Sequence, residues 1–434
     1  MIAFPFMTSY DPPGTSEGTL DPLGLYQIAD QLAVKLVPAV RERMQRIRFL
    51  TAMAVGTLIT EGLGEDARQR DASPYLGWEW LVVESLIRNT DNDSQIWGVP
   101  GTLVTRRALS QHGYLDAQSY LKTPRVFGYH GVYKRLAIHL GIVNVHLGPG
   151  PNTQGLVDAW ARDLQSGGLA DVKPMLSNWS AALRRSMNEK PPRTKSGWSS
   201  NAWDELARAF APGASNTHEK RYLRKLLLSE DDRRLGALPI LWQLQAEFKN
   251  DEFQEETLQR RLGERAPEYG PLLKAIRAYE EFARSLQDAF DVLKAEASEA
   301  SRLDTQGFEV SQITHDDDFK QCAEGLHDLY GEAYRALGEV TMDNVSVQNL
   351  FAERFSPFSE PVDAGKCASD LCRHHETIQQ GKSADGKRPW FIRTGPNRIY
   401  IRHDYRDQRR PIQPGRYVHD YRGWPIRRFY KDLS

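Results

Sequence analysis

The sequence predicts a mainly α, multi-domain protein. We expect an N-terminal helical domain with a winged-helix-like element, a central helical bundle or coiled-coil-like arm, and a small basic α+β module at the C-terminus. Apolar residues recur at helical spacing through most of the 434 residues, and proline- and glycine-rich breaks separate these stretches. Strand-like alternation is confined to the end of the chain. The predicted segments are 1–150, 151–235, 236–305 and 306–434.

The first predicted domain begins with a helix. Leu25, Ile28, Leu32 and Leu36 step by three and four residues, and Pro38 ends the pattern. A second helix is expected at 40–58. It opens with a basic cluster that serves either as a solvated helix face or as a contact surface: Arg41, Arg43, Arg46 and Arg48. A third helix is expected at 78–87.

Residues 96–146 have the order of a small DNA-binding element. Helices are expected at 103–112 and 128–140, followed by a strand at 141–147. Two short helices followed by an extended segment are compatible with a winged helix-turn-helix, although any small helical subdomain shows the same order. Nucleic-acid contacts are expected from the basic residues of this element, chiefly Arg106, Arg107, Lys134 and Arg135, with Arg125 nearby.

The central segments are separated by a hinge at 148–153 and a linker at 190–200, with helices at 154–187 and 202–210. A heptad stripe follows, in which apolar residues alternate by four and three: Leu272, Ile276, Tyr279, Ala283, Leu286, Phe290, Leu293 and Ala297. The stripe predicts either a long core helix or an arm or dimer seam that pairs with a helix at 240–262.

The last 53 residues, 382–434, carry a charge opposite to that of the rest of the chain. They hold 14 Lys and Arg against 5 Asp and Glu, a net charge of +9, whereas residues 1–381 hold 42 against 52. Nine aromatic residues are interleaved with these bases. A helix at 362–379 and a β-hairpin at 390–402 with its turn at 394–397 are expected here.

Two interpretations of this tail stay open. A surface rich in arginine and aromatic residues suits phosphate backbones and stacked bases. It equally suits an internal interface in which the arginines pair with carboxylates from elsewhere in the chain. For the first interpretation, the candidate nucleic-acid contacts are Lys387, Arg388, Arg398, Arg402, Arg409 and Arg410.

The catalytic patterns in the sequence are incomplete. His375-Glu376 lacks the second histidine of a zinc-protease motif, since Gln379 takes its place. Gly381-Lys382-Ser383 lacks the glycine loop that cradles a nucleotide phosphate. Asp385-Gly-Lys387, with Asp370 and Glu376 upstream, resembles the acids of a metal-dependent nuclease, but we expect it in a turn. No catalytic residue, metal or cofactor is therefore predicted.

The composition also indicates the cellular compartment. Three cysteines, without a second close pair, predict neither a disulfide framework nor a zinc site. No apolar run approaches the length of a membrane span, and the N-terminus lacks the pattern of a signal peptide. We expect a cytoplasmic protein with no membrane contact.

Several short blocks are similar to those of uncharacterised bacterial proteins encoded in restriction and phage-defence gene neighbourhoods. The blocks include Asp21-Pro-Leu-Gly24, the Arg43-x-x-Arg46-x-Arg48-Phe49 run, Gly98-Val-Pro-Gly101, and Gly386-Lys-Arg-Pro-Trp390. Where we would expect threonine before the arginines, the chain has Arg43-Met-Gln. The resemblance implies a subunit of a defence complex that acts beside an ATPase, a helicase or a nuclease.

The leading functional hypothesis is a non-catalytic DNA-binding or adaptor subunit of a bacterial antiviral complex, with nucleic acid, first of all DNA, as its partner. A metal-dependent nuclease effector is the competing hypothesis. The third is a structural assembly subunit with a basic docking tail.

Overall fold

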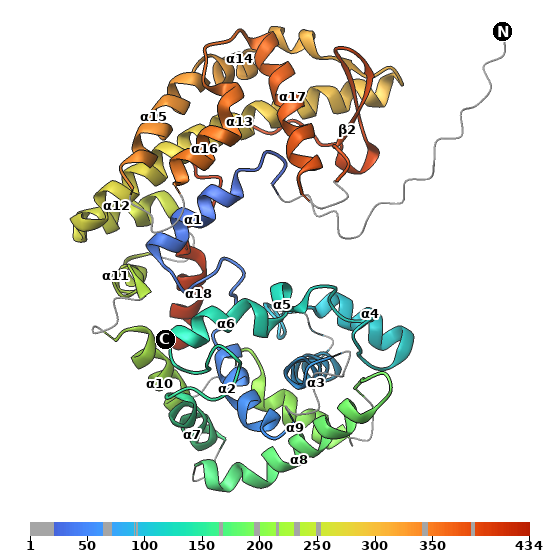
Figure 1. Ribbon diagram of the computed structural model, residues 1–434, viewed down its shortest axis with the longest axis vertical. Helices are drawn as coiled ribbons and strands as arrows, with labels where there is room; N and C mark the ends of the chain where they lie inside the picture. Colours follow the sequence, from blue (N-terminus) through green and yellow to red (C-terminus); the bar gives the residue numbers. More distant parts are fainter. Residues whose placement is uncertain are drawn as a thin grey trace, which may run out of the picture. The chain divides into compact units, whose positions relative to one another are not determined.

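The computed structural model describes residues 21–63, 72–90, 92, 94–164, 168–194, 200–213, 217–229, 235–248, 253–340, 346–382 and 387–434. The chain forms two compact units. The first contains residues 1–32 and 266–419, and the second contains residues 33–265 and 420–434. Eighteen α-helices are present in the described residues, with one small antiparallel sheet (Figure 1). The predicted mainly helical class is confirmed, whereas the predicted division into four segments stays a prediction.

The second unit is wholly helical in its described residues. Its helices before the long segment of the other unit are α2 (Phe49–Thr60), α3 (Pro74–Arg88), α4 (Thr102–His112), α5 (Pro124–Phe127), α6 (Tyr129–His139), α7 (Thr153–Asp163), α8 (Leu169–Asn188), α9 (Ser200–Phe210), α10 (Thr217–Leu227), α11 (Leu238–Leu244) and α12 (Glu255–Arg265). The C-terminal helix α18 (Gly423–Leu433) returns to this unit.

The core of the second unit is built around α2 and α3, which are buried along nearly their whole length. Trp78 of α3 packs edge-on against Phe210 of α9, and Phe210 stacks on Trp160 of α7 with ring centroids 5.6 Å apart. Such aromatic contacts contribute stability beyond the area that they bury. Since α2 is apolar on all sides, it suits a central position in this bundle.

The first unit is organised on α13 (Gly270–Leu303), a helix of 34 residues. The other helices are α14 (Asp317–Glu324), α15 (Leu326–Gly338), α16 (Val347–Phe355) and α17 (Ala364–Gln380); α1 (Tyr26–Leu36) begins in this unit. The heptad stripe of α13 is buried against α14, α15 and α17 of the same unit. The core-helix interpretation of the stripe is therefore supported within this unit.

The sheet of the first unit has the order β1-β3-β2, with β1 (Phe308–Glu309), β2 (Phe391–Gly395) and β3 (Arg398–Ile401) all antiparallel. The predicted hairpin at 390–402 is confirmed as β2 and β3. The short strand β1, which pairs with the other side of β3, was not predicted from the sequence.

Three local predictions were wrong. The helix expected at 40–58 begins only at Phe49, so the arginines at 41–48 lie in turns and irregular backbone that precede it. The strand expected at 141–147 is a series of turns with one isolated bridge, because Gly141 and Leu147 adopt left-handed conformations. The described chain thus has no strand to form a wing there. The helix expected at 240–262 is divided into α11 and α12.

Among the described residues, no helix combines the length and the apolar character needed to cross a bilayer.

Candidate anion-binding site

The arginines of the basic tail that lie in the first unit are largely engaged. Arg398 pairs with Glu309 at 3.0 Å, across the β1–β3 ladder. Arg409 contacts three carboxylates, with distances of 2.6 Å to Asp316, 2.5 Å to Asp318 and 3.2 Å to Glu296. These contacts join the tail to α13 and to the start of α14.

The remaining predicted contacts of the tail differ in exposure. Arg402 donates from Nε to the carbonyl of Pro389, and the largely exposed Arg410 pairs with Asp407 three residues earlier. Lys387 is half-buried, and its backbone N–H donates to a carbonyl of α17; Arg388 is exposed. The structure therefore places most of these cations in local contacts of the first unit.

The acids of the nuclease hypothesis are also engaged with cations. Asp370 is buried on α17 and pairs with Lys366 and Arg373, while Glu376 forms a two-pronged pair with Arg393. Asp385 and Ser383 lie outside the described residues. In the part of the chain that the structure describes, no group of three or more His, Cys, Asp or Glu side chains is arranged to hold a metal ion.

The two adjacent histidines of α17 make hydrogen bonds to backbone groups of the first unit. Nδ1 of His375 contacts the carbonyl of Pro22 at 3.0 Å, and its Nε2 accepts the backbone N–H of Trp390. Burial lowers the pKa of His375 to about 3, so this ring stays neutral and able to accept that hydrogen bond. His374 contacts the carbonyl of Leu23. Both rings fasten the N-terminal segment of the first unit to α17.

A different basic region lies in the second unit, at residues 94–157. It contains six Lys and Arg and a single acidic residue, Asp116. The carboxylate of Asp116 is occupied within its own turn, where it accepts the N–H groups of Gln118 and Ser119. The helices α4, α5 and α6 carry most of these bases and follow one another along one side of the unit (Figure 1).

Five of the six cations of this region make no ion pair with the residues that the structure describes. On α4, Arg107 is exposed and Arg106 is half-buried. On α6, Arg135 is exposed and Lys134 is half-buried. Among the described residues, no ion pair is made by Arg107, Lys122, Arg125, Lys134 or Arg135. The structure thus leaves three of the predicted residues, Arg107, Lys134 and Arg135, without an ion pair among the described residues.

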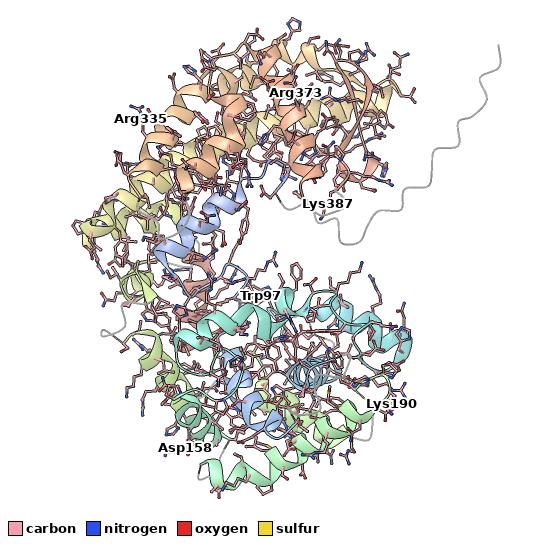
Figure 2. The ribbon with its side chains drawn as sticks, viewed as in Figure 1. Trp97, Asp158, Lys190, Arg335, Arg373 and Lys387 are labelled. Atoms are coloured by element: carbon pink, nitrogen blue, oxygen red, sulfur yellow. The ribbon has the colours of Figure 1, made fainter. Side chains whose placement is uncertain are left out.

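Exposed aromatic rings accompany these cations. Arg43 lies over the ring of Phe127, 4.5 Å from its centroid, and Phe127 is 45% exposed. Trp97, labelled in Figure 2, is contacted by the guanidinium groups of Arg46 and Arg428 at 4.9 and 5.4 Å. Arg46 also pairs with Asp432 at 2.7 Å. Arginine over an aromatic face is a favourable cation–π contact.

A pocket of about 740 Å³ opens beside these helices, where the end of α2, the start of α3, α5, α6 and the 145–149 loop meet. Its basic lining comes from Arg125 of α5, His130 and Lys134 of α6, and His146 of the loop. Glu61, exposed at the end of α2, contributes a carboxylate at the rim. The volume is in the range of small-molecule sites.

A buried carboxylate lies behind the pocket wall. Glu79 of α3 is fully buried and accepts three hydrogen bonds: from the Tyr120 hydroxyl at 2.8 Å, from the backbone N–H of His130 at 2.9 Å, and from Nδ1 of His130 at 2.6 Å. Burial, and next the charge of Glu79, raise the pKa of Tyr120 well above its usual value, so its hydroxyl remains a donor. A carboxylate only accepts, so Nδ1 carries the proton.

Two glycines allow this arrangement. A Cβ on Gly128, the residue before α6, would lie 2.0 Å from Oε1 of Glu79. A Cβ on Gly131 would lie 2.2 Å from the carbonyl oxygen of Arg125. Glycine has no side chain, so the start of α6 can approach Glu79 closely enough for the backbone N–H of His130 to bind its carboxylate.

Comparison with protein-family models, with curated proteins and with solved structures finds no match.

Sequence reasoning did not find the Glu79–His130 pair or the pocket. Glu79 lies in the middle of an apolar helix, Gly77-Trp-Glu-Trp-Leu81, and no spacing connects it to a histidine 51 residues later. Two signals were nevertheless present: the scarcity of acids across 94–157, and the Gly128-Tyr-His-Gly131 sequence, in which two glycines flank a histidine at a predicted helix start.

Proposed function

We propose that the chain is a nucleic-acid-binding protein, with DNA as its first partner, and that it binds through the α4–α6 side of the second unit. Its setting would be a non-catalytic subunit or adaptor of a bacterial antiviral complex, as the sequence resemblance implies. The observation that carries the proposal is the positive charge of residues 94–157: the segment has six bases and one acid, which is occupied in its own turn, and five of the bases make no ion pair among the described residues.

The aromatic rings on the same unit support this proposal. Phosphate contacts by Lys and Arg supply affinity, and exposed aromatic or guanidinium planes provide surfaces on which unpaired bases stack. Arg43 over Phe127 and the Trp97 cluster offer both elements. The tail of the first unit supports the proposal less, because Arg398 and Arg409 are occupied by carboxylates.

The test is the salt dependence of DNA binding. Each phosphate neutralised by the protein adds about 0.9 to the slope of log K against log salt for duplex DNA. Replacement of Arg107, Lys122 and Arg135 by Gln should reduce that slope by about 3 and lower the affinity at low salt. These side chains are exposed, so the melting temperature should be unchanged.

If the wild-type protein binds DNA and the triple variant has the same slope of log K against log salt, the α4–α6 surface does not bind DNA. Absence of salt-sensitive DNA binding by the wild-type chain would refute the proposed function itself.

A further inference from the structure

We propose that the pocket lined by Arg125, His130 and Lys134 binds a phosphomonoester group, and that His130, held by Glu79, shares a proton with one of its oxygens. The inference rests on the pocket and does not require the proposed DNA surface. Two sources offer this chemistry: the terminal phosphate of a nucleic-acid strand and a free nucleoside monophosphate.

His130 lies at the pocket wall and is held there by Glu79. The residue is only 6% exposed, and its Nδ1 is bound to Glu79 behind the wall. The two ring nitrogens point away from each other, so Nε2 is directed away from that carboxylate. Nε2 has no hydrogen-bond partner among the described residues, although His130 lines the pocket. A ring nitrogen that has no protein partner, on a largely buried histidine at a cavity wall, is the natural position for a ligand contact.

The orientation of the ring is also fixed. The ring of Tyr75 packs edge-on against it, with centroids 5.9 Å apart, and the hydroxyl of Tyr75 is anchored on the carbonyl of Met53 at 2.7 Å. Glu79 in turn is held by Tyr120. A side chain that is already oriented loses little entropy when a ligand binds.

The charge of the pocket fits a doubly charged group. A phosphomonoester carries about 1.5 to 2 negative charges near neutral pH, with a second pKa of about 6, whereas a phosphodiester carries one. Arg125 and Lys134 supply two positive charges on the pocket lining. The N-terminus of α3, a helix of 15 residues, opens on the same pocket at Ser73 and Pro74 and adds the positive end of its dipole.

The proton balance follows from Glu79. In the neutral ring, Nδ1 carries the proton and donates it to the carboxylate of Glu79, so Nε2 contacts a phosphate oxygen only if one further proton lies between them. Above about pH 6 the free phosphomonoester has lost that proton, so binding takes one up from solvent. Among the described residues, the charged and titratable groups around the ring are Glu79 and Tyr75 of α3, Tyr120, Arg125 of α5, Tyr129 and Lys134 of α6, Glu61 directly after α2 and His146 of the loop.

The experiment uses the full chain and three probes: a short single-stranded DNA with a terminal phosphate, the same strand with a hydroxyl end, and adenosine monophosphate. We expect either the phosphate-ended strand or the free monophosphate to bind the pocket. His130→Gln should reduce that binding by about tenfold to a hundredfold, the range for a hydrogen bond to a charged group. His139→Gln, on the same helix but outside the pocket lining, should have no effect.

A second pair of variants separates this site from the DNA surface. Lys134→Gln should weaken the binding of adenosine monophosphate, whereas Arg135→Gln, at the next position and outside the lining, should leave it unchanged. Arg135→Gln should affect only the salt-dependent binding of longer DNA. This pair also keeps the proposal testable if His130→Gln lowers the stability of the fold.

Calorimetry in two buffers of different ionisation enthalpy supplies the last readout. The wild-type protein should take up a proton on binding, and His130→Gln should not. The proposal is overturned if neither phosphomonoester probe binds, or if His130→Gln and Lys134→Gln bind them as the wild type does. A DNA surface without such a pocket would then still show its salt dependence, so the two proposals fail separately.

Discussion

Residues 391–410 of the first unit and residues 94–157 of the second each hold six Lys and Arg, yet their surroundings differ. In the first region, carboxylates from other segments pair with three of the arginines: Glu309, Asp316 and Glu376 each receive one. In the second region, Asp116 is occupied by its own turn and no other acid occurs in the segment.

The comparison shows that local charge is a poor guide to available charge. The segment with the stronger signal in the sequence is held to its own unit by ion pairs. In the segment that looks more ordinary, five of the six cations make no ion pair with the described residues. Availability for a ligand depends on which partners the fold provides, and those partners lie up to about a hundred positions away in the sequence.

The largest expected effect concerns α13, which carries Glu296, one of the carboxylates that pair with Arg409. Leu286 is fully buried in the stripe of α13, so Leu286→Ala should lower the free energy of unfolding by about 2–5 kcal/mol. Thermal melts together with sedimentation check this. If the variant loses self-association and its melting point is unchanged, the stripe is an interface between subunits and not a core helix. The position of Glu296 on α13 would then depend on that association.

The next effect concerns the tail itself. Arg409→Glu places a fourth acid beside Asp316, Asp318 and Glu296. We expect a loss of about 1–3 kcal/mol, a moderate value because Arg409 is one-third exposed and solvent screens the contacts. Chemical denaturation at low and high salt checks the effect, which should shrink as salt is added. An unaltered stability would mean that the tail arginines are as free as those of residues 94–157.

The same ion pairs have a signature in acid. A hydrogen bond from Arg409 lowers the pKa of Asp316, so the folded state holds the ionised form more tightly than the unfolded state does. That stabilisation is present above the unfolded pKa and is lost as the pH falls through the folded pKa, below about pH 4. Arg409→Glu should remove this part of the acid sensitivity.

Two carboxyl groups of the second unit, Asp420 and Glu255, have pKa values shifted in the direction opposite to that of Asp316. Burial first, and then the charge of Glu42, raise the pKa of Asp420 to about 6; burial and the charge of Asp420 raise that of Glu255. The folded state therefore binds protons more tightly, and stability falls as the pH rises from about 4 through about 6. Asp420→Asn should raise the stability by about 1–2 kcal/mol at neutral pH and change it little in acid.

Melting temperatures of Asp420→Asn and wild type across this pH range check the expectation. A constant difference at all pH values would contradict it, because the gain must come from the titration of the carboxyl pair.

The smallest expected effect concerns the exposed aromatic rings of the second unit. Phe127→Ala should weaken the binding of single-stranded DNA by about tenfold, the contribution of one stacked base, and leave duplex binding nearly unchanged. Leu103, 80% exposed on α4, offers a matched control, because Leu103→Ala removes apolar surface without removing a stacking plane. Equal losses in the two variants would exclude base stacking on Phe127.

The sequence predicted the helices well where periodicity was long. The stripe of α13 and the helix α17 were predicted close to their observed bounds, because each buries one continuous face. The start of α2 was misplaced: Met44 and Ile47 are buried like core helix residues, although they lie in turns. Burial alone cannot distinguish these two conformations.

The candidate site was predictable only in part. Arg107, Lys134 and Arg135 could be named as candidates because bases on short helices are visible in the sequence, and their role stays a prediction. Glu79 was not found, because a carboxylate inside an apolar helix becomes meaningful only when the fold brings the start of α6 to it. The partners of Arg409 were likewise invisible, since charge pairing between distant segments leaves no local pattern.

The central claim is that the tail arginines stabilise the first unit whereas the bases of residues 94–157 bind nucleic acid. One measurement tests it most directly: DNA affinity and melting temperature, side by side, for two matched triple variants. The first replaces Arg393, Arg398 and Arg409 by Gln, and the second replaces Arg107, Lys122 and Arg135 by Gln. Our account predicts a lower melting temperature with unchanged DNA affinity for the first, and weaker DNA binding with an unchanged melting temperature for the second. The reverse pattern, with DNA binding lost in the tail variant alone and the fold intact, would contradict it.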